Sequence, residues 1–265
     1  MKTTTKNTQP SRINIITLGC SKNTCDSEAL AGQLSGQGLS VAHEGPGEIV
    51  VINTCGFFGD AKEQSIDVIL EQAERKRRGE IQRLYVTGCL VQRYQEELAA
   101  ELPEVDGFYN LSQLRELLSA LGADYRTSLV GERLLSTPSH YAYLKISEGC
   151  DRSCSYCAIP MIRGRHISVP MEDLVAQAEK LAQGGVKELI LIAQDLTYYG
   201  IDLYGKRCLA ELIRRLARID GIRWIRLHYL YPEWKTFWRS WPPNPKYANT
   251  WTSPCNISPT AFSAR

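Results

Sequence analysis

The segment Ile13-Asn-Ile-Ile-Thr-Leu-Gly-Cys20 is an apolar, β-prone run that ends in a short polar step and a cysteine. The pattern recurs as Ile49-Val-Val-Ile-Asn-Thr-Cys55 and as Leu84-Tyr-Val-Thr-Gly-Cys89. Helical periodicity follows each run, over residues 26–37, 59–78 and 92–100. A repeat of strand, cysteine and helix predicts an α/β domain with a parallel sheet and crossover helices.

These three cysteines, named here the strand-end trio, each follow the carboxyl end of a predicted strand. In a parallel sheet these ends share one edge, where ligands gather. We therefore expect Cys20, Cys55 and Cys89 to face one crevice, although they lie far apart in the sequence. A single cysteine after a strand is more often a small core residue, but the shared register favours a joint role. Three thiolates suggest an iron–sulfur cluster with one open iron.

The sequence after residue 139 predicts a second domain, because strands and helices alternate again. A run of strand, loop, helix, strand, helix and strand is typical of the start of a (β/α) barrel. We expect five parts along the chain. They are a flexible N-terminus at 1–12, the N-terminal domain at 13–122, a linker at 123–139, a partial barrel at 140–232 and an irregular tail at 233–265.

The strongest chemical motif is Glu148-Gly-Cys150-Asp-Arg-Ser-Cys154-Ser-Tyr-Cys157, whose cysteines are named here the loop trio. Three thiolates so close in sequence can hold three irons of a [4Fe–4S] cluster. The fourth iron is then open to the amino and carboxylate groups of S-adenosylmethionine (SAM). The alternative is a zinc site, which normally needs four N or S ligands. His166 is the one nearby candidate for the fourth, and CxxxC is an unusual zinc spacing, so the cluster is favoured.

Three further residues are predicted to bind the cofactor. Gln194 and Asp195 follow the strand predicted at 186–193, at the end where barrels present binding groups. Tyr156 lies within the cysteine loop. The sequence identifies no catalytic acid or base.

The composition of the chain indicates the compartment in which the protein is expected. Nine cysteines in a chain with no apolar leader are expected to be thiols or ligands, because the cytoplasm keeps thiols reduced. No run approaches the roughly 18 apolar residues of a membrane span, so we expect a cytoplasmic protein without membrane contact. A net charge of +2 gives no indication of a nucleic-acid partner.

Several motifs resemble the radical SAM methylthiotransferases: Gly19-Cys20-Ser-Lys-Asn23, Asp26-Ser-Glu28, Asn53-Thr-Cys55-Gly-Phe57 and Tyr143-Leu-Lys-Ile-Ser-Glu-Gly-Cys150. The resemblance runs from about Ile13 to Pro232. The segment Arg226-Leu-His-Tyr-Leu-Tyr-Pro232 is similar to the branch of this family that modifies ribosomal protein uS12, rather than the branch that modifies transfer RNA.

The resemblance implies two [4Fe–4S] clusters and SAM. The strand-end trio would hold an auxiliary cluster and the loop trio the SAM cluster. The implied reaction adds a methylthio group to the β-carbon of an aspartate in uS12, free or on the ribosome. An electron donor such as flavodoxin or ferredoxin is implied as well, and we expect a monomer. Two alternatives stay open: a transfer-RNA adenosine methylthiotransferase, and a truncated, inactive iron–sulfur protein.

The tail after about Glu233 departs from the family, which continues with further barrel units and a small β-rich domain. A back-translation from Asn244 onward, read two bases later, can encode PQICKYMDIPLQHISDS, which resembles that continuation. We therefore expect a frameshift near Glu233 and an out-of-frame, poorly ordered tail. Half a barrel would expose apolar strand edges, so low activity is expected of the chain as written.

Overall fold

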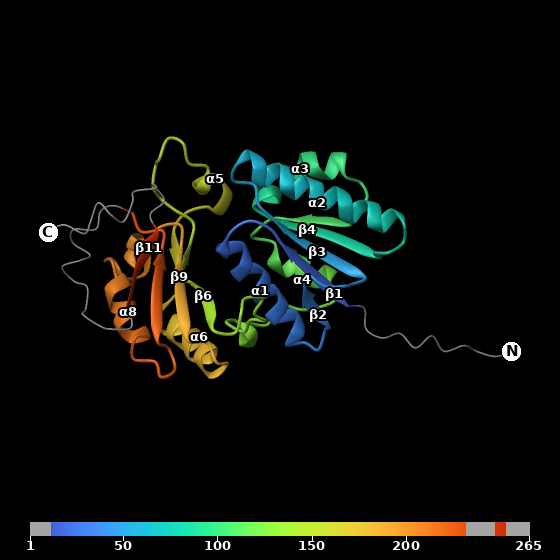
Figure 1. Cartoon of the computed structure of the whole chain (residues 1–265). Helices are drawn as coiled ribbons and strands as arrows, with labels where there is room; N and C mark the ends of the chain where they lie inside the picture. Colours follow the sequence, from blue (N-terminus) through green and yellow to red (C-terminus); the bar gives the residue numbers. More distant parts are fainter. Residues whose placement is uncertain (1–11, 232–246, 253–265) are drawn as a thin grey trace, which may run out of the picture. The chain divides into compact units, whose positions relative to one another are not determined.

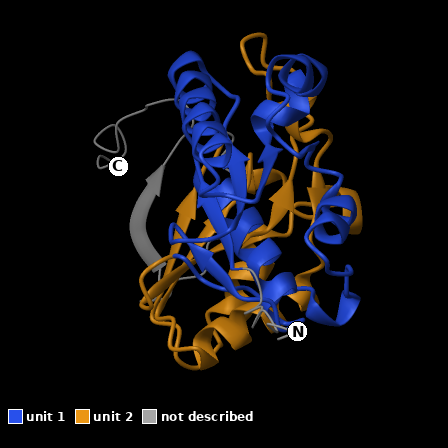
Figure 2. Ribbon diagram, turned by 90° about the vertical axis from the view of Figure 1, so that its right-hand side faces the viewer, with its two compact units in different colours: residues 1–136 blue, residues 137–265 orange. Residues whose placement is uncertain are grey.

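The structure is a computed structural model that describes residues 12–231 and 247–252. The chain divides into two compact units, Met1–Ser136 and Thr137–Arg265 (Figure 2). Each unit is built around one parallel sheet, so the predicted α/β class is confirmed. No helix within the described ranges combines the length and the apolar character needed to cross a bilayer.

Unit 1 alternates strands and helices in the predicted order. Its elements are β1 (Ile13–Thr17), α1 (Ser21–Ser35), β2 (Val41–His43), β3 (Ile49–Thr54), α2 (Gly59–Arg77), β4 (Arg83–Gly88), α3 (Cys89–Glu101), β5 (Gly107–Tyr109), α4 (Leu114–Ala120) and the 3-10 turn η1 (Thr127–Leu129). The strands pair in the order β2-β1-β3-β4-β5, and all pairings are parallel. The winding reverses between β1 and β3, the place where doubly wound sheets bind ligands.

Helices cover both faces of this sheet, with α1 and α4 on one side and α2 and α3 on the other (Figure 1). Successive side chains of a strand point to opposite faces of the sheet, so each strand contributes residues to two hydrophobic cores. Val51 packs with residues of α1 and α4, whereas Val50 and Ile52 pack with residues of α2 and α3. A sheet buried on both faces explains why the strands are mostly apolar on both faces.

Two helices begin earlier than their periodicity predicts. α1 starts at Ser21 instead of residue 26, and α3 starts at Cys89 instead of residue 92. Each is entered through a glycine with positive φ, Gly19 at +94° and Gly88 at +104°. This backbone conformation is readily open to glycine. The sharp turns place Cys20 at the N-cap position of α1 and Cys89 at the first residue of α3.

The segment predicted as a linker, 123–139, contributes much of its length to unit 1. Gln33 of α1 donates a hydrogen bond to the Arg126 carbonyl (2.9 Å), and the fully buried Glu28 accepts one from the Ser136 backbone (2.8 Å). A Cβ at Gly32 would lie 2.3 Å from the carbonyl oxygen of Glu132. The segment therefore packs closely along α1.

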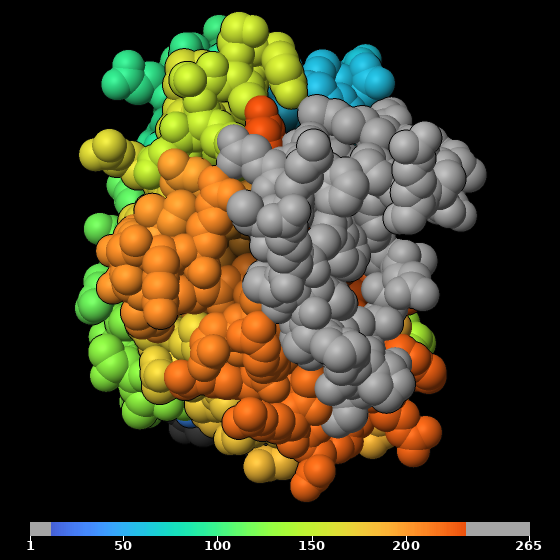
Figure 3. All heavy atoms as spheres, turned by 90° about the vertical axis from the view of Figure 1, so that its left-hand side faces the viewer, coloured from blue at the N-terminus to red at the C-terminus, as the bar shows by residue number. Residues whose placement is uncertain are grey.

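Unit 2 contains the strands expected for the start of a barrel. Its elements are β6 (Tyr141–Lys145), β7 (Ser147–Glu148), α5 (Ile159–Arg163), β8 (Ile167–Ser168), α6 (Met171–Gln183), β9 (Glu188–Ile192), η2 (Leu196–Tyr198), α7 (Ile201–Tyr204), α8 (Leu209–Leu216), β10 (Trp224–His228) and β11 (Tyr247–Thr252). The sheet order β11-β10-β9-β6 is parallel throughout. β7 and β8 form a short antiparallel ribbon, and α8 forms part of the surface seen in Figure 3.

Only β11 of the predicted irregular tail is described, and it pairs in parallel with β10. A regular strand here differs from the sequence expectation. Ladder hydrogen bonds use backbone groups alone, so this pairing does not require an alternating side-chain pattern. The remainder of the tail, together with residues 1–11, lies outside the described residues, and the frameshift remains a prediction.

Candidate functional site

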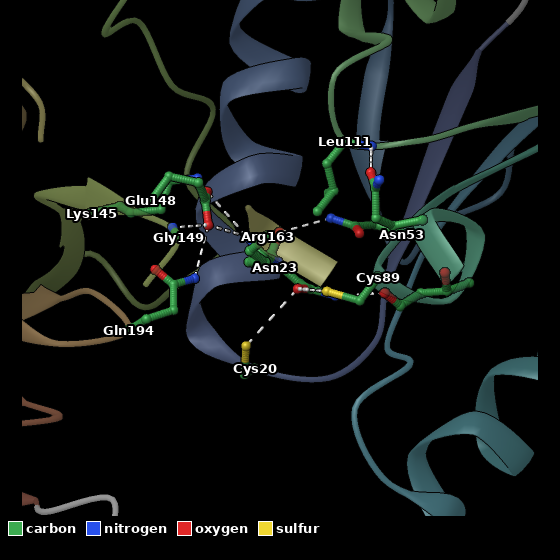
Figure 4. Close-up of polar contacts among 12 residues, drawn as sticks. Cys20, Asn23, Asn53, Cys89, Leu111, Lys145, Glu148, Gly149, Arg163 and Gln194 are labelled. Atoms are coloured by element: carbon green, nitrogen blue, oxygen red, sulfur yellow. Dashed lines mark hydrogen bonds and ion pairs between the residues drawn. The ribbon is translucent and has the colours of Figure 1, made fainter. Parts of the chain in front are cut away.

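The strand-end trio converges at the carboxyl edge of the sheet in unit 1. The thiol of Cys20 lies 3.9 Å from Asn23 Oδ1, and the thiol of Cys89 lies 3.8 Å from the same oxygen (Figure 4). A Cβ at Gly19 would lie 3.0 Å from Cys55 Sγ, so the third thiol packs against the turn that carries the first. The structure thus brings together three residues that belong to three separate strand-to-helix turns.

Local contacts fix Cys55 and Cys89 in this edge. The Cys55 backbone N–H donates to Ser65 Oγ (3.1 Å). A Cβ at Gly56 would lie 2.7 Å from Leu90 Cα, and one at Gly88 only 2.4 Å from the Thr54 carbonyl oxygen. Glycine is therefore required beside both cysteines, because the ends of β3 and β4 approach too closely for a side chain.

Asn23 was quoted in the sequence only as part of a motif, but it is the centre of this edge. Its side chain is fully buried, and Nδ2 donates to the carbonyls of Leu18 and Thr54, both at 2.9 Å. The Asn23 carbonyl accepts a hydrogen bond from Asn53 Nδ2 (3.0 Å). A polar residue three positions after a strand-end cysteine, in the first turn of a helix, is the signal that could have identified it.

The loop trio occupies the segment between β7 and α5 in unit 2. All three thiols are partly exposed. The Cys157 N–H donates to the Cys154 carbonyl (3.0 Å), and the Cys150 N–H donates to the Gly164 carbonyl (3.1 Å). Burial raises the pKa of the Cys150 thiol above its ordinary value, and the Arg152 backbone N–H opposes that rise. Backbone hydrogen bonds therefore close the loop, and the three thiols are not needed to hold it.

Arg152 anchors this loop to the end of the sheet in unit 2. Its Nε lies 2.6 Å from Asp195 Oδ2, and its guanidinium lies 3.5 Å from the centroid of the Tyr231 ring. Asp195 is buried and also accepts hydrogen bonds from the backbone and hydroxyl of Thr197, at 2.9 and 2.6 Å. Asp195, predicted as a cofactor contact, therefore also caps η2 and holds the loop.

Glu148 forms polar contacts with three side chains, a role that the sequence did not predict. Lys145 Nζ lies 2.6 Å from Oε2, while Arg163 and Gln194 reach Oε1 at 3.1 and 2.8 Å (Figure 4). Burial alone would raise the pKa of Glu148, but Lys145 and Arg163 lower it to about 2. Glu148 is therefore a carboxylate at neutral pH. In the sequence, the position of Glu148 directly before Gly149 and Cys150 is the one feature that could have indicated a role beside the cysteine loop.

The two other residues predicted to bind the cofactor, Gln194 and Tyr156, differ in burial. Gln194 Oε1 is buried and has no hydrogen-bond partner in the described part of the chain, so one acceptor stays available beside Glu148. Tyr156 is 79% exposed.

The surroundings of His166 bear on the zinc alternative. His166, the candidate fourth zinc ligand, is buried, and its Nε2 lies 3.0 Å from Ser168 Oγ and 3.7 Å from Asp202 Oδ1. Within the described ranges, no three His, Cys, Asp or Glu side chains surround a point that could hold a single metal ion. In a cubane each thiolate binds its own iron, so three sulfurs need only border one space and not meet at one ion.

Comparisons with known proteins match both units. Residues 12–110 match the family described as "Uncharacterized protein family UPF0004", and residues 144–236 match the "Radical SAM superfamily". A protein of Christiangramia forsetii named "Ribosomal protein uS12 methylthiotransferase RimO" is 60% identical over 228 residues, which cover 86% of this chain and 51% of that protein. A protein of the same name from Bacteroides thetaiotaomicron is 61% identical over 224 residues, covering 83% and 51%. The chain spans about half the length of these relatives.

Solved structures share the fold at low sequence identity. The cobalamin-dependent SAM radical enzyme OxsB matches with a TM-score of 0.52 at 11% identity, over 87% of this chain and 41% of that chain. The radical SAM methyltransferase TsrM from Kitasatospora setae matches with a TM-score of 0.54 at 13% identity, over 84% and 55%. These structures show the fold alone. The two family matches and the similar relatives confirm the predicted resemblance: the chain belongs to the radical SAM methylthiotransferase family.

Proposed function

We propose that this chain carries the cofactor-binding part of an enzyme that adds a methylthio group to the β-carbon of an aspartate in ribosomal protein uS12. The observation that carries the proposal is the presence of two cysteine trios, one gathered from three strand ends and one within a single loop. The names of the close relatives support uS12 as the substrate over transfer RNA.

Each trio supplies three thiolates and suits a [4Fe–4S] cluster with one iron left open. The loop trio would hold the cluster that binds SAM, and the strand-end trio would hold the auxiliary cluster. When bound, the SAM cluster would supply the electron for reductive cleavage of SAM to methionine and a 5′-deoxyadenosyl radical. The chain's own contribution is to hold the reacting groups in position and to exclude water.

Two residues beside the loop would complete the SAM site, and a third would support it. Gln194 is supported by its buried, unpartnered Oε1, which can accept from the amino group of SAM. Tyr156 is supported by an exposed ring next to Cys157. Asp195 is already held by Arg152 and Thr197, so its contribution would be to keep the cysteine loop in place.

The proposal extends to partners and location. The substrate would be uS12, free or within the ribosome, and an electron donor such as flavodoxin or ferredoxin would reduce the SAM cluster. We infer a monomeric, cytoplasmic protein.

Anaerobic reconstitution tests the cofactor set. The full chain should bind about eight irons, four for each cubane, and Cys150→Ala and Cys55→Ala should each remove about half of them. Cys208→Ser is the matched control, because Cys208 is a buried thiol outside both trios. Iron uptake that is insensitive to either alanine variant, or stoichiometric zinc in place of iron, would overturn the assignment.

Mass spectrometry tests the substrate. Incubation of the reconstituted chain with SAM, sulfide, a reductant and uS12 should yield a methylthio mass increase on an aspartate peptide of uS12, at the low yield expected of half a barrel. The same increase on an anticodon-loop adenosine, with uS12 unmodified, would assign the chain to the transfer-RNA branch. Two clusters with neither product would refute activity of this chain and leave its cofactor set standing.

A further inference from the structure

Asn23 contacts all three turns that carry the strand-end trio. Its Nδ2 donates to Leu18, in the turn after β1, and to Thr54, at the end of β3. Its Oδ1 faces the thiols of Cys20 and Cys89 at 3.9 and 3.8 Å. One side chain therefore links turns that the sequence separates by whole strand and helix units.

The orientation of this amide is determined by its partners. Both backbone oxygens bonded to Nδ2 are acceptors and can be satisfied only by N–H groups. The opposite orientation would place Oδ1 against two carbonyls, so Oδ1 must face the thiols. The residue is fully buried, which makes these hydrogen bonds costly to lose.

A second layer of contacts holds Asn23 itself. Asn53 Nδ2 donates to the Asn23 carbonyl and to Ser27 Oγ, both at 3.0 Å. A Cβ at Gly19 would lie 3.4 Å from Asn23 Nδ2 and 2.7 Å from Cys55 Cβ, so the amide and Cys55 lie against the same glycine. The amide is thereby fixed relative to all three cysteines.

We propose that Asn23 is the positioning residue of the auxiliary cluster site, and that its amide sets the relative placement of Cys20, Cys55 and Cys89 before iron binds. The inference rests on the proposed function, because the auxiliary cluster belongs to that proposal. A site whose ligands come from three separate turns needs a residue that holds these turns together, because ligands are positioned by partners that are themselves fixed.

Crosslinking of the metal-free full chain tests the placement directly. Dibromobimane joins only thiols that lie close together, and peptide mapping identifies the pair. The wild-type chain should give a Cys20–Cys89 crosslink. Asn23→Ala and Asn23→Asp should each reduce its yield at least about tenfold, the scale expected for losing two buried hydrogen bonds. Asn23→Asp keeps the volume but removes both donors, so it separates hydrogen bonding from packing.

Asn14→Ala is the matched control. Asn14 is also buried, on the same strand β1, but its Oδ1 accepts from the Gly45 N–H at the other end of that strand. It should retain the crosslink and full iron uptake, whereas both Asn23 variants should lose about half of the iron and the spectrum of the auxiliary cluster. Circular dichroism checks that each variant is folded.

Three results would overturn the proposal: no Cys20–Cys89 crosslink in the wild-type chain, a wild-type crosslink yield in Asn23→Asp, or an equal loss in Asn14→Ala. The first of these does not depend on whether any variant folds. If the wild-type chain crosslinks in an Asn23-dependent way but takes up only one cluster, the proposed function fails while the placement of the cysteines by Asn23 stands, so the two failures are distinguishable.

Discussion

Replacement of Glu148 by glutamine tests the polar cluster beside the cysteine loop. The carboxylate is bonded to Lys145, Arg163 and Gln194, and glutamine keeps its size but removes its charge. The pKa of Glu148 is lowered from 4.5 to about 2. At about 1.4 kcal/mol per pH unit this corresponds to roughly 3 kcal/mol of stability. The side chain is 32% exposed, so solvent screening reduces the expected effect to about 1–2 kcal/mol.

The effect has a defined pH dependence. A carboxyl group whose folded pKa lies below its unfolded pKa stabilises the fold at pH values above the unfolded pKa, and this stabilisation is lost as pH falls through the folded pKa. The difference in unfolding free energy between wild type and Glu148→Gln should therefore be constant from pH 7 to about 5 and shrink between about 4.5 and 2.

Urea unfolding of the metal-free chain at several pH values measures this difference. The control is Glu211→Gln, which breaks an exposed ion pair to Arg215 on α8 and should leave stability unchanged within error. A difference that is the same at pH 3 and pH 7, or a variant as stable as wild type at pH 7, would refute the role of the charge.

Other substitutions address the framework of the two sites. Arg152→Ala removes a largely buried ion pair and should loosen the cysteine loop by about 2–4 kcal/mol, seen as faster hydrogen exchange in that loop. Gly149→Ala would place a Cβ 1.9 Å from a backbone oxygen and should abolish the loop cluster, whereas Gly185→Ala, with open space around it, should cost about 1 kcal/mol in thermal unfolding. Ser65→Ala removes the hydroxyl bonded to the Cys55 backbone and should cost about 1–2 kcal/mol by the same measurement.

The parallel sheet could be predicted because its signals are local. In unit 1 each long strand is a mostly apolar run, a cysteine follows it within three residues, and helical periodicity comes next. The short strands β2 and β5 have three residues each, too few to show any period. The helix starts at Ser21 and Cys89 were also missed, because they depend on positive-φ glycines and not on side-chain pattern.

The site was only partly accessible from sequence. The residue type and spacing of cysteines indicate that they can act as ligands, so both trios could be proposed as cluster sites from the sequence. Glu148 collects partners from β6, α5 and the end of β9, and no spacing rule links these segments. The role of Asn23 depends on which backbone carbonyls the fold turns toward it. Such contacts arise only once tertiary structure is formed.

The two trios differ in how much of the chain each requires, and this bears on their biogenesis. Cys150, Cys154 and Cys157 lie in one short loop, so a nascent chain can present all three as soon as that loop is synthesised. Cys20 and Cys89 become neighbours only after β4 has joined β3 in the sheet. Because loop closure over a long segment must be offset by tertiary contacts, the strand-end trio is assembled only when unit 1 has folded, and binding of the proposed auxiliary cluster would report the integrity of that unit.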